Sequence, residues 1–167
     1  MYKRQDRSIR DSQSTGARAT PIPEHLHTVT PRLVVGDGRA AIAFYEKAFG
    51  AQQVEEPFLL ASGEVVHAEL LIGDSVVMIT QEGAPAEDSP CADRVPCVIM
   101  ATYWEDVDAA CERALRAGAH VIFPLADQFY GERGGRLGDP FSQQWMLSQR
   151  IEALTRDQLL QRARGAA

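Results

Sequence analysis

Short runs of β-branched and other apolar residues, separated by turn residues, recur through the first half of the chain. Between the first two runs, apolar residues repeat at helical spacing and predict a helix over residues 39–49, with Asp37 and Gly50 as its cap residues. The alternating runs themselves predict strands at residues 28–35, 52–60, 64–72 and 75–81. Pro31 lies within the first run, which indicates an edge strand or a bulge.

The same order of elements returns after a proline-containing segment. Asp106 can cap a helix over residues 107–117, and Gly118 follows that helix as Gly50 follows the first. The remaining predicted elements are strands at residues 95–103, 120–124, 135–137 and 144–149, and a last helix over 156–164. The chain thus repeats a β-α-β-β-β order twice. One such module leaves a sheet face unburied, whereas two can curl their sheets around a shared concavity.

We therefore predict an α+β fold in which two βαβββ modules form a curved, eight-stranded mixed sheet around a cavity. The predicted domain spans residues 25–152, with modules at about 28–82 and 95–150. A linker at 83–94 joins them, and the domain is followed by a helix and tail at 153–167. The polar, mixed-charge segment at 1–24 lacks any hydrophobic period and is predicted to be a disordered tail.

Composition narrows the possible partners. The net charge of −6 disfavours a nucleic-acid partner, and no apolar run is long enough to span a membrane. The three cysteines, an odd number, lack metal-type spacing and do not suggest a disulfide framework, so we expect the cytoplasm.

The most informative stretch is the glycine-rich segment 127–145, which we interpret as a hairpin loop that ends in an Asp139-Pro140 turn. Four further segments accompany it in order, at residues 30–37, 43–50, 67–75 and 105–108. Together they resemble the vicinal oxygen chelate (glyoxalase/bleomycin resistance/dioxygenase) superfamily, in particular its PhnB-like branch. The resemblance implies a cavity for a small molecule and a homodimer.

The resemblance also implies where a metal would be held in metal-dependent members of the superfamily. The four ligand positions fall on Thr30, Met78, Ile99 and Met146, which are poor donors for the metals that this superfamily uses. We therefore expect no metal and no cofactor. Gln143 stands where relatives of this branch have a histidine and cannot exchange protons near pH 7, and Ser142 replaces a glycine.

Three residues are candidates for acid–base chemistry: His67, Glu69 and Tyr130. His67 and Glu69 are two apart on a predicted strand and so share a face. A solvated or cross-strand hydrogen-bonded pair is the alternative interpretation. His25 and His27 are interpreted as surface residues.

Six residues are candidates for ligand contact. They offer amide, guanidinium, aromatic or thioether groups, and they are Gln128, Arg133, Gln143, Trp145, Met78 and Met146. For Arg133 the alternative is an ion pair with Glu132 or Asp127, and for Trp145 and the two methionines it is packing in the core.

Two functions follow as hypotheses. The first is a metal-independent protein of the glyoxalase/bleomycin-resistance type that sequesters a small, partly aromatic ligand in the sheet cavity. The second is an enzyme of the same fold, a glyoxalase-like lyase, isomerase or cyclase, that uses side-chain acid–base catalysis. The sequence does not decide between them, because function depends on the site and not on the fold.

Overall fold

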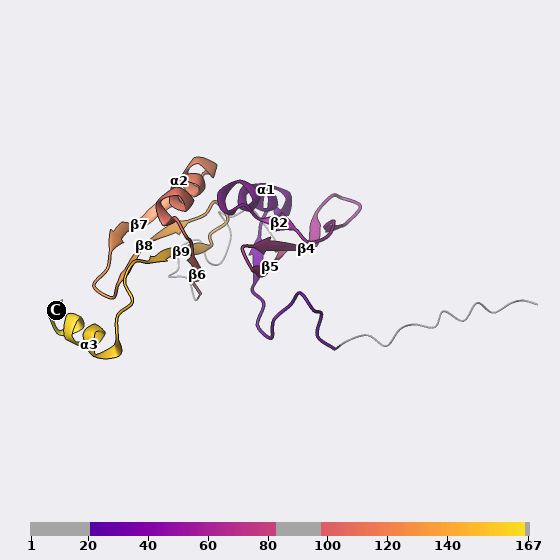
Figure 1. Cartoon of the computed structure of the whole chain (residues 1–167). Coiled ribbons are helices and arrows are strands. Elements are labelled where there is room, and N and C mark those ends of the chain that lie inside the picture. The colour runs from indigo at the N-terminus through magenta and orange to yellow at the C-terminus, as the bar shows by residue number, and fades with distance from the viewer. Residues whose placement is uncertain (1–20, 83–97, 166–167) are drawn as a thin grey trace, which may run out of the picture.

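The structure is a computed structural model that describes residues 21–82 and 98–165 (Figure 1). Most of the predicted tail at 1–24 and the predicted linker at 83–94 lie outside the described residues. Within the described ranges, no helix combines the length and the hydrophobicity needed to cross a bilayer.

The first module contains one helix and five strands. Its elements are β1 (Arg32–Val35), α1 (Gly38–Phe49), β2 (Gln52–Gln53), β3 (Phe58–Leu59), β4 (Val65–Ile72) and β5 (Ser75–Gln81). The sheet has the order β1-β5-β4-β2, with β3 also paired to β4, and β1 runs parallel to β5 at its edge. Pro31 precedes β1, and its carbonyl accepts a hydrogen bond from the Met78 N–H. The predicted strand at 52–60 is interrupted at Pro57, which has no N–H to donate to a ladder.

The second module repeats this plan with four strands. Its elements are β6 (Met100–Tyr103), α2 (Val107–Ala117), β7 (His120–Asp127), β8 (Glu132–Gly138) and β9 (Gln144–Arg150), followed by α3 (Arg156–Gly165). The sheet has the order β6-β9-β8-β7. The prediction of a long loop from residue 127 was wrong, because β7 and β8 pair almost to the turn at Gln128. Glycines in β8 favour a loop locally, but pairing to strands on both sides orders this segment.

The two helices are capped in the same way, which makes the repeat visible at the level of side chains. Asp37 accepts from the Ala40 N–H and Asp106 from the Ala109 N–H, at 3.0 and 2.9 Å. The last strand of each module adds a second cap. Gln81 Oε1 accepts from the Gly38 N–H at 3.1 Å, and Gln149 Oε1 accepts from the Val107 N–H at 3.3 Å.

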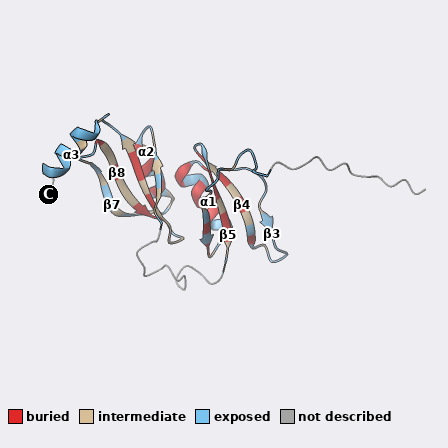
Figure 2. Ribbon diagram, turned by 90° about the horizontal axis from the view of Figure 1, so that it is seen from below, coloured by how far each residue is buried: buried red, intermediate tan, exposed pale blue. Residues whose placement is uncertain are grey.

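Both helices lie on one side of the two sheets and pack against each other, and the opposite face of each sheet is left open (Figure 1). Seen from below in Figure 2, buried strand residues alternate with exposed and half-buried ones. The α+β class and the two-module order are confirmed. The strands form two sheets, of five and four strands, and not one continuous sheet of eight.

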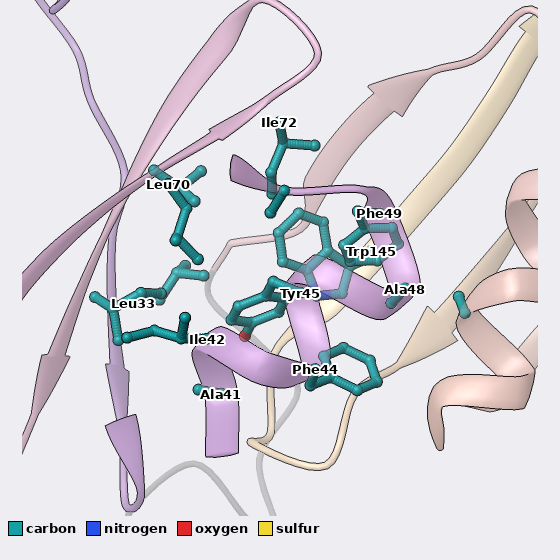
Figure 3. Close-up of a cluster of buried hydrophobic side chains, with 14 of the residues drawn as sticks. Leu33, Ala41, Ile42, Phe44, Tyr45, Ala48, Phe49, Leu70, Ile72 and Trp145 are labelled. Carbon is teal, nitrogen blue, oxygen red and sulfur yellow. The ribbon is translucent and has the colours of Figure 1, made fainter. Parts of the chain in front are cut away.

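An aromatic cluster joins the modules beneath the helices. Trp145, which is 1% exposed, lies with its ring centroid 4.6 Å from that of Phe49 and 5.5 Å from that of Tyr45 (Figure 3). Phe44 and Phe141 extend the cluster through edge-on and tilted contacts. Because Tyr45 and Phe49 belong to α1 and Trp145 to β9, this contact is a large part of what holds the modules together.

One buried carboxylate organises the cluster. Asp139 Oδ2 accepts from the Tyr45 hydroxyl at 2.7 Å and from Trp145 Nε1 at 2.9 Å. Its Oδ1 accepts from the N–H groups of Phe141 and Gln143 in the β8–β9 turn. Burial raises the pKa of Asp139, although all four hydrogen bonds act in the opposite direction, and burial beside Asp139 also raises the pKa of Tyr45.

The substitution Asp139→Asn should lower the free energy of unfolding by about 2–4 kcal/mol, because an amide NH₂ would then face two donors, Tyr45 and Trp145. Urea denaturation at pH 7 measures this. Asp74→Asn is the control, since this carboxylate lies in the β4–β5 turn and bonds the hydroxyl of its neighbour Ser75. It should stay within about 0.5 kcal/mol of the parent. A loss for Asp139→Asn no larger than that of the control would contradict the role given to the carboxylate.

The same pair of proteins tests the raised pKa. The Asp139 carboxyl binds its proton more tightly in the folded chain than in the unfolded chain. Its contribution to stability is therefore full below the ordinary aspartate pKa of about 3.9, and it is lost as the pH rises through the raised value. Asp139→Asn should remove this component from the plot of unfolding free energy against pH, and an unchanged slope above pH 4 would contradict it.

Ser142 carries the local strain of the β8–β9 turn. It is the single non-glycine residue at positive φ in the described ranges, at 67°, where left-handed backbone costs a side-chain-bearing residue about 1–2 kcal/mol. Ser142→Gly should therefore stabilise the protein by about 0.5–1 kcal/mol, after allowance for the larger backbone entropy that glycine loses on folding. Thermal and urea unfolding measure the gain. Ser62→Gly, at a turn residue outside that backbone region, should give none, and destabilisation by Ser142→Gly would refute the strain.

Candidate functional site

The open face of the first sheet carries three of the predicted site residues. Strand alternation places His67 and Glu69 of β4 on this face, while Ala68 and Leu70 point into the core. Met78 of β5 pairs with Glu69 in the ladder and lies on the same face. His67 and Glu69 therefore lie on the same face of the strand, as expected, and both side chains are partly exposed.

Glu69 is held between two imidazoles. His67 Nε2 lies 3.3 Å from Glu69 Oε1, and His25 Nε2 lies 2.7 Å from Glu69 Oε2. His25, interpreted as a surface residue, thus reaches across the open face from the segment before β1. Nothing local in the sequence indicates this contact, since 44 residues separate the two partners. A carboxylate between two imidazoles can accept and pass on a proton, so this face offers acid–base chemistry.

The open face of the second sheet holds a pocket of about 280 Å³. Three predicted residues line it, Gln128 and Tyr130 from the β7–β8 turn and Met146 from β9. Phe123, Arg136 and Ser148 complete its polar and aromatic lining, and the backbone of Gly134 and Gly135 forms part of its wall. The pocket therefore combines the apolar side chains of Phe123, Pro124 and Met146 with polar groups in similar measure, so its lining is more polar than that of most small-molecule sites.

A larger hollow of about 690 Å³ lies at the seam between the modules. Its walls include Val76 and Val77 of β5, Tyr103 of β6, Trp104 and Trp145. Trp145 is the one predicted ligand contact that lines it, and its buried ring and its hydrogen bond to Asp139 make it a core residue as well. Seven of the nine predicted site residues are thus divided among the two open faces and this seam, and the other two, Arg133 and Gln143, lie elsewhere.

All the hydrogen bonds that the structure gives the Arg133 side chain are to other residues of the same chain. Alternation along β8 turns it to the helix side, where Nε and Nη2 donate to the two carboxylate oxygens of Asp108 at 2.8 and 2.7 Å. Nη1 donates to Asp127 Oδ1 at 3.0 Å. These bonds raise the pKa of Arg133 and lower that of Asp108. The alternative of an ion pair that includes Asp127 matches this geometry, and the fork that was expected to meet a ligand ties α2 to the hairpin.

Gln143 has a similar connecting role. Its Nε2 donates to the carbonyls of Val34 and Phe141 at 3.2 and 3.3 Å, which links the β8–β9 turn to β1. The side chain thus contacts backbone of both modules, and its amide is placed between them and not over either pocket.

The residues at the four positions implied for a metal do not fit one. Thr30 uses its hydroxyl to donate to the His27 carbonyl, and Ile99 offers no donor. Met78 and Met146 offer thioethers from two different sheets. Among residues 21–82 and 98–165, no group of three or more His, Cys, Asp or Glu side chains is placed to hold an ion. The donor chemistry of these four residues thus disagrees with a divalent-metal centre.

Arg136 is a pocket residue that the sequence reasoning missed. Because the segment around it was interpreted as a loop with a short strand at 135–137, no face could be assigned to its arginines. The strand β8 places Arg133 and Arg136 on opposite faces, and the second of them lines the pocket.

Known proteins resemble this chain in sequence and in fold. The sequence model of the Glyoxalase/Bleomycin resistance protein/Dioxygenase superfamily matches residues 25–147. Uncharacterized proteins of Mycobacterium bovis and Mycobacterium tuberculosis are each 36% identical over 139 residues, which is 78% of this chain and 88% and 79% of those proteins.

Solved structures extend the likeness. TioX from Micromonospora sp. ML1 aligns with a TM-score of 0.57 and 26% identity, over 77% of this chain and all of that chain. The fosfomycin resistance protein FosX from Listeria monocytogenes, in a complex with Mn(II) and 1S,2S-dihydroxypropylphosphonic acid, aligns with a TM-score of 0.55 and 22% identity, over 80% and 94%. The match of the superfamily model to most of the chain, together with these relatives, shows that the protein belongs to the glyoxalase/bleomycin resistance protein/dioxygenase superfamily.

Proposed function

We propose that the protein is a metal-independent binding protein that sequesters a small, partly aromatic molecule. One observation carries the proposal: Gln128, Tyr130 and Met146 line a single pocket of about 280 Å³ above the second sheet. This volume lies just below the usual range of about 300–1,000 Å³ for small-molecule sites, which fits a ligand of one ring and a few substituents. Phe123 and Met146 offer apolar contact, and Gln128 and Tyr130 offer hydrogen bonds that orient the guest.

The donor set supports metal independence. FosX, whose solved structure contains Mn(II), shares the fold at 22% identity, but here thioethers and an isoleucine occupy the positions implied for metal ligands. The order of motifs favours the PhnB-like branch of the superfamily. The odd number of cysteines keeps the cytoplasm as the proposed compartment.

A homodimer belongs to the same proposal. The open faces expose large apolar side chains, among them Val34 at 48% and Phe58 at 66% on the first sheet and Phe123 at 57% on the second. A second copy that lays its first sheet over the pocket would cover these groups and exclude water from the ligand. Met78 and the Glu69 cluster would then contact the ligand from the opposite side.

The second candidate is an enzyme, a lyase, isomerase or cyclase of this fold. The Glu69 carboxylate between His25 and His67 favours it, because such a group can take a proton from a substrate and return it elsewhere. In this reading Glu69 or His67 is the base and Tyr130 is a proton donor on the facing sheet. Within one chain these residues lie on two different sheet faces, so catalysis requires a second copy whereas binding in the pocket does not. Sequestration is therefore the preferred function.

If the pocket above the second sheet holds the guest, Met146→Trp should weaken the binding of single-ring probes such as benzoate by about tenfold or more, since the indole fills the volume. Titration of ¹⁵N-labelled protein with benzoate, followed through amide shifts, measures this. Leu160→Trp, on the exposed surface of α3, should bind like the parent. Equal effects of the two variants, or shifts confined to residues outside the pocket, would refute the site.

The same purified protein separates the two functions. Elemental analysis should find far less than one metal ion per chain. Native mass spectrometry identifies any small molecule that co-purifies, and incubation of that molecule with the protein should leave its mass unchanged. Should that molecule be converted by the parent and bound but not converted by His67→Ala, the enzyme is favoured. One equivalent of Zn, Mn, Ni or Fe per chain would overturn metal independence.

A further inference from the structure

Arg136 occupies an unusual electrostatic position on the open face of the second sheet. It lies in β8 opposite Met146 of β9, and its guanidinium carbon is 5.1 Å from the centroid of the Phe123 ring. Its Nε is buried and has no hydrogen-bond partner within the described residues. A guanidinium nitrogen taken out of water without an acceptor is costly, so this N–H calls for a partner that the described chain does not supply.

Arg133, in the same strand, is a guanidinium whose hydrogen bonds are formed within the chain, and it serves as a comparison for Arg136. Arg133 makes three hydrogen bonds to Asp108 and Asp127. Between residues 21–82 and 98–165, in contrast, no carboxylate forms an ion pair with Arg136. Among the described residues, the guanidinium that lines the second sheet's pocket thus has an aromatic neighbour but no carboxylate partner, and that pocket is where the proposed ligand binds.

A second orphaned atom lies on the same face of the sheet. Among the residues that the structure describes, Gln144 Oε1 is also buried without a hydrogen-bond partner. Gln144 pairs with Gly138 and Met146 with Arg136, so Gln144 and Arg136 are diagonal neighbours on one face of the β8–β9 ladder. One atom is an unmet donor and the other an unmet acceptor. Of the two residues, Arg136 lines the pocket, so its unmet donor is the one that a guest in the pocket can meet.

We infer that Arg136 anchors the carboxylate of a small aromatic acid. The Nε–H is covered in this structure, so the side chain must rotate before the Nε–H and the adjacent Nη–H can together meet the two oxygens of a planar carboxylate. The ring of the guest lies against Phe123 and Met146. The inference rests on the proposed binding function and adds to it the chemical class of the ligand.

The test compares benzoate with benzamide, which has the same ring and nearly the same shape but no charge. Both are titrated into ¹⁵N-labelled full-length protein, and affinities are read from shifts of pocket amides. The parent should bind benzoate about tenfold or more tightly than benzamide. The Nε–H signal of Arg136 is assigned as the arginine side-chain signal that the Arg136→Gln variant lacks, and benzoate should shift this signal in the parent. In Arg136→Gln the benzoate affinity should fall to that of benzamide, while the benzamide affinity stays within about twofold.

Two further variants secure the interpretation. Arg136→Lys keeps the charge without the fork and should retain a weaker preference for benzoate. Arg116→Gln removes an exposed charge of α2, paired with Glu112, and should keep the full preference. The amide spectrum of each variant outside the pocket must match that of the parent, which verifies folding before the affinities are compared.

Any of four results would overturn the inference. Equal affinities of the parent for the two probes, or an unchanged preference in Arg136→Gln, would show that Arg136 does not read the charge, while the binding function would survive. If a second copy supplies the anion, Arg136→Gln will alter the sedimentation profile and benzoate will leave the Nε–H signal unmoved. Failure of both probes to shift any pocket amide would remove the proposed function together with the inference.

Discussion

The buried carboxylate of Asp139 is the constraint on which the arrangement of both modules depends. It fixes the Tyr45 hydroxyl of the first helix and the Trp145 indole of the last strand through one oxygen, and the β8–β9 turn through the other. Because Trp145 is thereby held in the core, strand alternation turns Met146 to the open face. A hydrogen bond in the interior thus decides which residues line a pocket on the outside.

Strand alternation also places the two arginines of β8 on opposite faces of the sheet, one in a structural role and one facing the pocket. Arg133 turns to the helix side and joins α2 to the hairpin through Asp108 and Asp127, whereas Arg136 turns to the open face. A shift of one residue in the pairing of β8 with β9 would exchange these roles. The register is fixed at both ends of the ladder, by the Asp139 turn at one end and at the other by the Ile151 and Glu152 N–H groups, which both donate to the Gly131 carbonyl.

The predictable parts of this fold are those whose causes are local. The helix at 107–117 was predicted from its Asp106 cap, its apolar stripe and Gly118, and the structure has these bounds. The extent of β8 was missed, because glycine-rich sequence favours loops and its order comes from partner strands. The contact of His25 with Glu69 was missed as well, since it joins segments 44 residues apart. The sequence pattern predicts that His67 and Glu69 share a strand face, but it does not show which distant side chain contacts them.

The two modules keep one scaffold and differ in the chemistry of their open faces. Gln81 and Gln149 cap the two helices in the same way, and Met78 and Met146 occupy corresponding places in β5 and β9. Around these shared positions, the first face gathers imidazoles about a carboxylate, and the second gathers a guanidinium, aromatic rings and an amide. A bound acid needs the second face alone, because its charge is met there. Catalysis needs both faces at once, because the proton carriers lie on the first. The relation between the two functions is therefore set by whether a second copy brings the opposite faces together over one guest.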